Sequence, residues 1–217
     1  MKIHYLLAIL CLSFSSHGAA NLLPNGNFDK GEKQAASWEH IDGLTSFWEY
    51  EKGRGRILKV DSRVSRKQAL AWKQQQKKNP GAKPPYPSKK LQCVASMEGV
   101  TLDSGLIDVE PGQNYKLSVD YRGRFKPIIW IKGFMFHPGS KMLTDCYQTR
   151  LVPENDDPEK WKTFSIDFNP TQRISGTCKI KVRIFGYWAP GIYYFDNVRI
   201  EKISPEEMAK FVSKRSK

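Results

Sequence analysis

The sequence predicts an all-β fold, a jelly-roll β-sandwich, on three observations. Apolar and polar residues alternate with a period of two in the segments 115–121, 164–168 and 180–184, a pattern typical of half-buried antiparallel strands. No segment with a helical period alternates with these strands, which argues against a doubly wound α/β enzyme fold. Turn residues separate many of the segments, among them Pro111-Gly112, Pro138-Gly139 and Pro190-Gly191.

Further strands are expected along the chain wherever a short apolar or alternating run is bounded by turn residues. These segments are 56–60, 91–96, 105–109, 128–136, 147–151 and 192–200. Many short strands with frequent breaks are typical of a sandwich or a jelly roll.

Length and composition limit the possible classes of protein. The chain has 217 residues with 35 Lys+Arg and 22 Asp+Glu, a formal net charge of +13, and 40% hydrophobic residues. That length suits one domain with a sizeable core, and the ordinary apolar fraction argues against wholesale disorder. After residue 20, no apolar run approaches the roughly 20 residues that a membrane helix needs.

The first twenty residues have the layout of a secretory signal peptide. Lys2 precedes the apolar segment 5–14, and Gly18-Ala19-Ala20 supplies small residues before a cleavage site. The alternative is a buried N-terminal strand or helix. We therefore expect a mature chain that begins near Asn21 and is secreted or resides in the periplasm or cell envelope.

Three cysteines, Cys93, Cys146 and Cys178, remain after the signal peptide is removed. An odd number allows at most one internal disulfide, and Cys146–Cys178 is a possible pair. The alternative is three small buried thiols. Their spacing gives neither a CxxC motif nor a close-spaced zinc site.

One segment, 62–90, interrupts the strands and carries nine basic residues and no acidic one. Helix-forming residues over 65–78 precede the stop Asn79-Pro80-Gly81, and a Pro-rich loop follows. We interpret the chain as a signal peptide (1–20), a jelly-roll domain (21–203) with this helix-plus-loop insertion, and a helical tail (204–217). Ser204-Pro205-Glu206-Glu207 marks the start of the tail helix.

Three pieces of the sequence resemble carbohydrate-binding modules of families four, sixteen and twenty-two. They are NLLPNGNFDKG at 21–31, followed by Trp38; DSGLIDVEPGQNYKLS at 103–118; and YYFDNVRI at 193–200. The pieces occur in the family's order and span most of the mature chain. The resemblance implies a galactose-binding-like jelly roll that binds carbohydrate, and the Lys-rich insertion departs from the usual compact module.

The resemblance also implies a structural calcium ion that bridges the first and last strands. Asn27 and Asp29 match the ligand end of the opening motif, and Asp196 matches the closing one. Calcium takes several oxygen ligands from carboxylates and carbonyls, which chain ends brought together supply. The alternative is that Asp29 and Asp196 are ordinary turn and strand-end acids.

Aromatic side chains are the expected carbohydrate-binding residues. The C–H face of a sugar ring stacks on an aromatic ring, and a few fixed polar groups bind its hydroxyls. Tyr187 and Trp188 lie in a turn between two strands and are the first choice; Trp130 and Trp48 are the second. For any single Trp the alternative is a place in the core.

The expected function is therefore that of a secreted, non-catalytic module that binds a polysaccharide by aromatic stacking with assistance from basic residues. The basic insertion also favours an anionic polymer as a partner, whereas export argues against nucleic acid. No HExxH, GxSxG or phosphate-loop motif occurs. One alternative is a polysaccharide lyase or hydrolase on this fold, with Tyr187, His137, Arg183 and Arg150 as possible participants. The other is an envelope module that binds a protein through the insertion.

Overall fold

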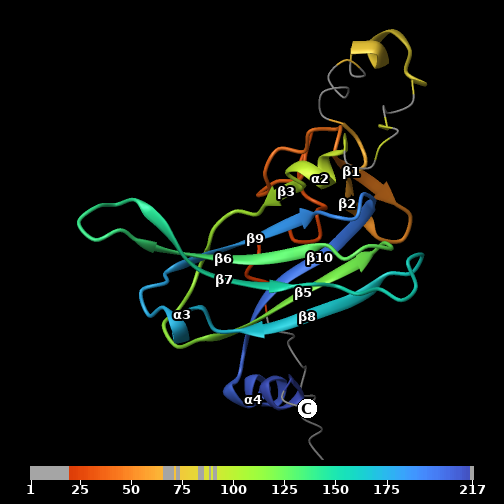
Figure 1. Cartoon of the computed structure of the whole chain (residues 1–217). Coiled ribbons are helices and arrows are strands. Elements are labelled where there is room, and N and C mark those ends of the chain that lie inside the picture. The colour runs from red at the N-terminus through yellow and green to blue at the C-terminus, as the bar shows by residue number, and fades with distance from the viewer. Residues whose placement is uncertain are drawn as a thin grey trace, which may run out of the picture.

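The computed structural model describes residues 20–65, 71, 74–82, 86–87, 89 and 92–215. Two antiparallel sheets form a β-sandwich (Figure 1), so the predicted fold class is confirmed. One sheet has the order β1-β2-β10-β5-β8, with the bounds Ser46–Glu51, Gly55–Asp61, Ile192–Ile203, Asn114–Arg122 and Lys162–Phe168. The other has the order β3-β9-β6-β7, with the bounds Val100–Asp103, Lys179–Gly186, Ile128–Phe136 and Leu143–Leu151. A two-residue strand, β4 (Ile107–Asp108), pairs with β9.

The core lies between the sheets and takes its side chains from alternate positions of each strand. From β5 and β9 the buried residues are Tyr115, Leu117, Val119, Tyr121, Ile180, Val182 and Ile184. Their sequence neighbours point outward, as the period-two pattern predicted. Burial of each aliphatic side chain contributes about 1.5–3 kcal/mol, so the alternation decides which residues of a strand remain outside.

The N-terminal segment is joined to the last strand. The Leu22 N–H donates to the Ile200 carbonyl at 2.8 Å, and the Val198 N–H donates to the Gly26 carbonyl at 2.8 Å. Phe28 is fully buried, with its ring centroid 4.9 Å from that of Trp38. The segment that carries the opening motif is thus an integral part of the sandwich.

Two expected strands differ from the structure, and two observed strands were not expected. The segment 91–96 contains the start of a short helix, α2 (Val94–Met97), because a short apolar run does not distinguish a strand from a buried helix. The expected strand 105–109 shortens to β4. β1 and β3 were not predicted; β1 is half-buried at most of its positions, which removes a clear alternation.

Helices cover the ends of the sandwich. α4 (Pro205–Arg215) begins as predicted: the Glu207 N–H donates to Ser204 Oγ at 3.3 Å, and the Ser204 N–H donates to Glu207 Oε2 at 3.1 Å. A four-residue helix, α3 (Pro170–Arg173), is capped by the side chain of Asn169. Within the predicted helix 65–78, residue 71 and residues 74–78 are helical, and the rest of 66–73 lies outside the described residues.

The predicted signal peptide lies outside the described residues, except for Ala20. Within the described part of the chain, no helix has both the length and the apolar character needed to cross a membrane.

Candidate functional site

The outer side of the second sheet, which we call the β6 face, carries an exposed aromatic and basic surface. It consists of the outward residues of three strands: Lys181, Arg183 and Phe185 of β9; Trp130, Lys132 and Phe134 of β6; and Gln148 and Arg150 of β7. Trp130 is placed there by the alternation, because its neighbours Ile129 and Ile131 are fully buried in the core.

One row of residues crosses all four strands of this sheet. Trp130 lies directly across from Arg183 on one side and from Arg150 on the other, and Arg183 lies across from Asp103 of β3. The guanidinium carbon of Arg150 is 5.6 Å from the centroid of the Trp130 ring. The strand register therefore places the Trp130 ring between two arginines.

A second row contains lysines and an amide. Lys132 lies between Lys181 and Gln148, and its Nζ donates to Gln148 Oε1 at 2.9 Å. The same Nζ is 3.8 Å from the Asp145 carboxylate and 5.9 Å from the Trp130 ring centroid. Polar groups in defined positions thus surround the ring.

Asp103 holds the basic side chains of β9 in place. Its buried carboxylate accepts two hydrogen bonds from Arg183, at 2.6 and 2.8 Å, and pairs with Lys181. Burial raises the pKa of Asp103, but the hydrogen bonds from Arg183 and Lys181 outweigh it and leave the pKa below its usual value. One carboxylate therefore partly neutralises two cations.

Tyr187 continues the same face beyond the end of β9. Its ring stacks on Phe185 with centroids 5.1 Å apart, and both Tyr187 and Trp188 are 44% exposed. The hydroxyl of buried Tyr193 donates to the carbonyls of Tyr187 and Ala189, at 2.7 and 2.6 Å, and so holds the turn. The structure thus places Tyr187 and Trp130 on one surface.

Trp48 belongs to the other sheet. It lies across from Leu58 on β2 and packs against the core. Its Nε1 donates to the Phe28 carbonyl at 2.8 Å, and Arg56 lies 4.6 Å from its ring centroid. The structure therefore places Trp48 in a different sheet from Trp130.

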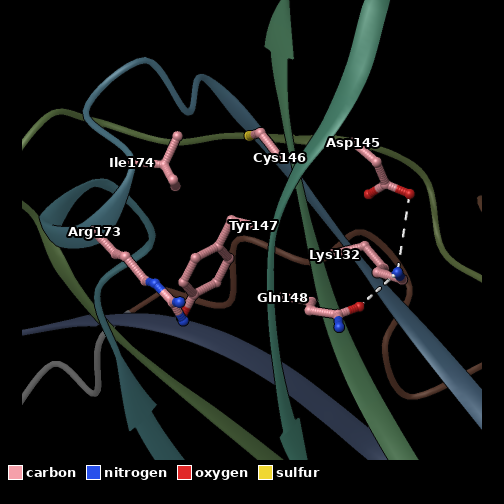
Figure 2. A pocket seen from close by; sticks show the side chains of 7 residues that line it. All are labelled: Lys132, Asp145, Cys146, Tyr147, Gln148, Arg173 and Ile174. Atoms are coloured by element: carbon pink, nitrogen blue, oxygen red, sulfur yellow. Dashed lines mark hydrogen bonds and ion pairs between the residues drawn. The ribbon is translucent and has the colours of Figure 1, made fainter.

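A pocket of about 410 Å³ opens at the edge strand β7, where the β6 face ends (Figure 2). We call it the β7-edge pocket; it is lined by Lys132, Asp145, Cys146, Tyr147, Gln148, Arg173 and Ile174. Figure 2 shows Lys132, Gln148 and Asp145 on one side of β7 and Arg173 and Tyr147 on the other. Sequence reasoning missed Arg173, because it lies at the end of a four-residue helix without a recognisable motif.

On the outer side of the first sheet, arginines lie over aromatic rings and pair with carboxylates. Arg122 pairs with Glu51 at 2.8 Å and lies over the rings of Trp161 and Tyr194. Arg54 lies 4.2 Å from the Trp161 centroid and pairs with Asp120 and Asp196. These side chains bind one another.

The residues implied as calcium ligands fit such an ion only in part. Asp196 is buried and accepts a hydrogen bond from Arg54 Nε at 2.8 Å, so an arginine already supplies a cation there. Asn27 and Asp29 lie together, with Asn27 Nδ2 2.7 Å from Asp29 Oδ2. Gly55 leaves space for Asp29, since a Cβ there would lie 2.3 Å from Asp29 Oδ1. No group of three His, Cys, Asp or Glu suited to a metal occurs among the described residues.

None of the described cysteines forms a disulfide, so the possible Cys146–Cys178 pair is not made. Cys146 Sγ lies 3.5 Å from Thr177 Oγ1, and Cys178 Sγ donates to the Phe134 carbonyl at 3.5 Å. Cys93 is buried beside α2.

Comparison with known proteins gives a likeness of fold. No family model and no curated protein matches the chain. A solved structure described as family 16 carbohydrate-binding module 2 covers 83% of this chain and 99% of its own, with 12% identity and a TM-score of 0.48. The enzymatically active domain of tailspike protein 4 of bacteriophage CBA120 covers 84% of this chain and 21% of its own, with 11% identity and a TM-score of 0.50.

Further similar structures include modules of families 4 and 22. A family 61 module in complex with β-1,4-galactotriose covers 85% of this chain and all of its own, with 13% identity and a TM-score of 0.46. These modules are similar to this chain in fold. At these identities the likeness concerns the fold alone.

Proposed function

We propose that this protein is a non-catalytic module that binds a polysaccharide on the β6 face. The observation that carries the proposal is Trp130, partly buried in the middle of the sheet between Arg183 and Arg150. A sheet strand holds the ring in one orientation, so little conformational entropy is lost when a ligand binds.

The chemistry of the face suits a sugar. An aromatic ring accepts the C–H face of a pyranose, while fixed donors and acceptors bind its hydroxyls. Gln148 and Lys132 supply such polar groups beside Trp130. Phe185 and Tyr187 extend the aromatic surface along β9, so several successive sugar units have room to bind.

Replacement of the central ring tests the proposal. We expect Trp130→Ala to weaken binding to a polysaccharide from a broad panel about tenfold or more, a loss of roughly 1.4 kcal/mol. Affinity electrophoresis at low and high salt measures it, with thermal unfolding as the check on folding. The matched control is Tyr50→Ala, which removes an exposed ring from β1 in the other sheet.

Equal affinity of Trp130→Ala and the parent protein, with intact folding, would contradict the assignment to the β6 face. Trp188→Ala tests the turn at the end of the face separately. If only Trp188→Ala weakens binding, the ligand contacts the loop edge and not the centre of the sheet.

We also propose that the chain is exported and that its mature form binds calcium at Asn27 and Asp29. A bound ion stabilises the folded state in proportion to its occupancy. Calcium should then raise the Tm relative to EDTA, and Asp29→Asn should abolish that difference. An identical Tm in calcium and in EDTA would overturn the calcium proposal without affecting the β6 face.

A further inference from the structure

Some positive charges at the β6 face and the β7-edge pocket have no carboxylate partner among the described residues. Arg54, Arg122, Arg63 and Lys59 of the first sheet or its flanking loops each pair with a carboxylate. Among the described residues, in contrast, no carboxylate pairs with Arg150 or Arg173. The Arg150 guanidinium carbon lies over the Trp130 ring, 5.6 Å from its centroid. Two guanidinium groups, Arg150 on β7 and Arg173 at the end of α3, are thus available to an anion from outside.

The β7-edge pocket places one of these guanidinium groups, that of Arg173, in a concave site together with Lys132. Lys132 enters it from β6 and Arg173 from the end of α3 (Figure 2). The single carboxylate of the lining, Asp145, is 60% exposed and stands 3.8 Å from Lys132. A volume of about 410 Å³ lies in the range of small-ligand sites, so the pocket admits one substituted sugar unit.

Tyr147 adds a neutral hydrogen-bond donor to the pocket. Burial raises the pKa of its hydroxyl and outweighs the opposing effects of a hydrogen bond with the Thr149 side chain and of the nearby Arg173 charge, so the phenol keeps its proton at neutral pH. The Arg173 side chain lies beside Tyr147 (Figure 2). A guanidinium fork, an ammonium and a phenol together form a donor set that suits a carboxylate or a sulfate.

We propose that the polysaccharide is acidic and that the β7-edge pocket binds its anionic group between Lys132 and Arg173, with Arg150 as a second contact beside Trp130. The inference rests on the proposed carbohydrate binding at the β6 face and names the ligand class for that site. Lys132 belongs to both surfaces, so a chain that stacks on Trp130 continues directly into the pocket. The basic insertion at 62–90 is not required.

The test uses two pairs of polymers that differ in charge alone. Polygalacturonate is compared with carboxyl-reduced polygalacturonate, and dextran sulfate with dextran, at 20 and 300 mM NaCl. The first pair reports a carboxylate ligand and the second a sulfate. We expect at least fivefold tighter binding to the charged member of one pair, and weaker binding at the higher salt because ions screen these contacts.

Arg173→Gln and Arg150→Gln locate the anion. Each should weaken binding to the charged polymer at least fivefold, and Arg173→Gln should leave affinity for the neutral counterpart unchanged. Arg199→Gln is the matched control: it removes the same charge from β10 on the other sheet, where Arg199 is also exposed. We expect it to leave binding unchanged.

The outcomes separate this inference from the proposed function. Equal binding of charged and neutral polymers, with loss in Trp130→Ala, overturns the acidic ligand and keeps the carbohydrate-binding face. Equal losses in Arg173→Gln and Arg199→Gln show an effect of net charge and overturn the pocket assignment. Absence of binding to both pairs, together with a neutral glycan bound elsewhere in the panel, overturns the acidic ligand as well. Absence of all glycan binding overturns both proposals.

Discussion

At the scale of single residues, Asp103 connects the stability of the fold to the shape of the β6 face. Its side chain is almost fully buried, yet it carries a charge because Arg183 and Lys181 hydrogen bond to it. Its backbone N–H donates to Glu39 Oε2 at 3.1 Å, which attaches the N-terminal segment to β3. The same carboxylate thus orients two cations of the face and stabilises the folded chain.

Asp103→Asn should lower the free energy of unfolding by about 2 kcal/mol at pH 7, the usual cost of a lost charged hydrogen bond. The folded-state pKa of Asp103 is depressed, so its contribution is complete above the unfolded value of about 3.9. As pH falls through the lower folded pKa, the carboxylate is protonated and the contribution disappears. Urea unfolding of both proteins from pH 7 to pH 3 measures the difference.

Asp108→Asn serves as the control for Asp103, because the Asp108 side chain is 84% exposed and pairs with Lys179 at the surface. Surface ion pairs contribute about 0–1 kcal/mol, so its loss should be small at every pH. A difference for Asp103→Asn that stays constant down to pH 3 would contradict the assigned role of its charge.

At the scale of elements, the turn between α2 and β3 supports the aromatic end of the β6 face. Gly99 has a φ of +69°, and a Cβ at this position would lie 2.2 Å from the Phe185 ring. The Phe185 ring in turn stacks on Tyr187. A side chain at residue 99 therefore displaces the ring on which the exposed Tyr187 rests.

Gly99→Ala should lower the Tm and weaken polysaccharide binding, because it adds both backbone strain and a steric clash with Phe185. Gly139→Ala is the matched control: its φ is +77°, but a Cβ there meets no atom within 4 Å. The control carries the strain of about 1 kcal/mol alone. If Gly139→Ala reduces binding as much as Gly99→Ala, the contact with Phe185 does not support the site.

Strands with a clear sequence pattern and turn residues at their ends were predictable from the sequence. Elements that are held by contacts between distant segments of the chain were not. β5 contains the predicted alternating segment 115–121, and β6 has the predicted bounds 128–136, where a largely apolar run ends at the turn 137–139. α2 was mistaken for a strand because its buried residues are held by segment 62–64: Val94 N–H donates to the Val64 carbonyl and Ala95 N–H to the Ser62 carbonyl. No local pattern contains that information.

The candidate site, too, was predictable from the sequence only in part. Trp130 was predicted as a possible binding residue from its aromatic character. Its neighbours Arg183 and Arg150 are 53 and 20 residues away in the sequence and become adjacent only through strand register. Arg173 reaches the pocket from a helix that no period indicated. The sequence therefore predicts the type of side chain, while the register decides which side chains meet.

At the scale of the whole molecule, the basic insertion is separable from the sandwich. The chain leaves at 62–64 and returns at 94–95, where two hydrogen bonds of 2.9 and 3.0 Å join its ends. The described contacts of the intervening residues with the domain are few: the Tyr86 hydroxyl donates to Asp61 Oδ2 at 3.0 Å, and Ala82 packs on Leu44. The core between the sheets does not depend on these contacts.

Replacement of residues 66–91 by a short Gly/Ser linker should therefore leave the fold intact. The loss of the Tyr86 contact is expected to cost about 1 kcal/mol, which circular dichroism and thermal unfolding measure. The deletion removes eight positive charges and no negative ones. Since the proposed anion site lies at Lys132 and Arg173, binding to the acidic polymer should persist within about threefold. A loss as large as that of Arg173→Gln, in a folded protein, would instead assign the anionic ligand to the insertion.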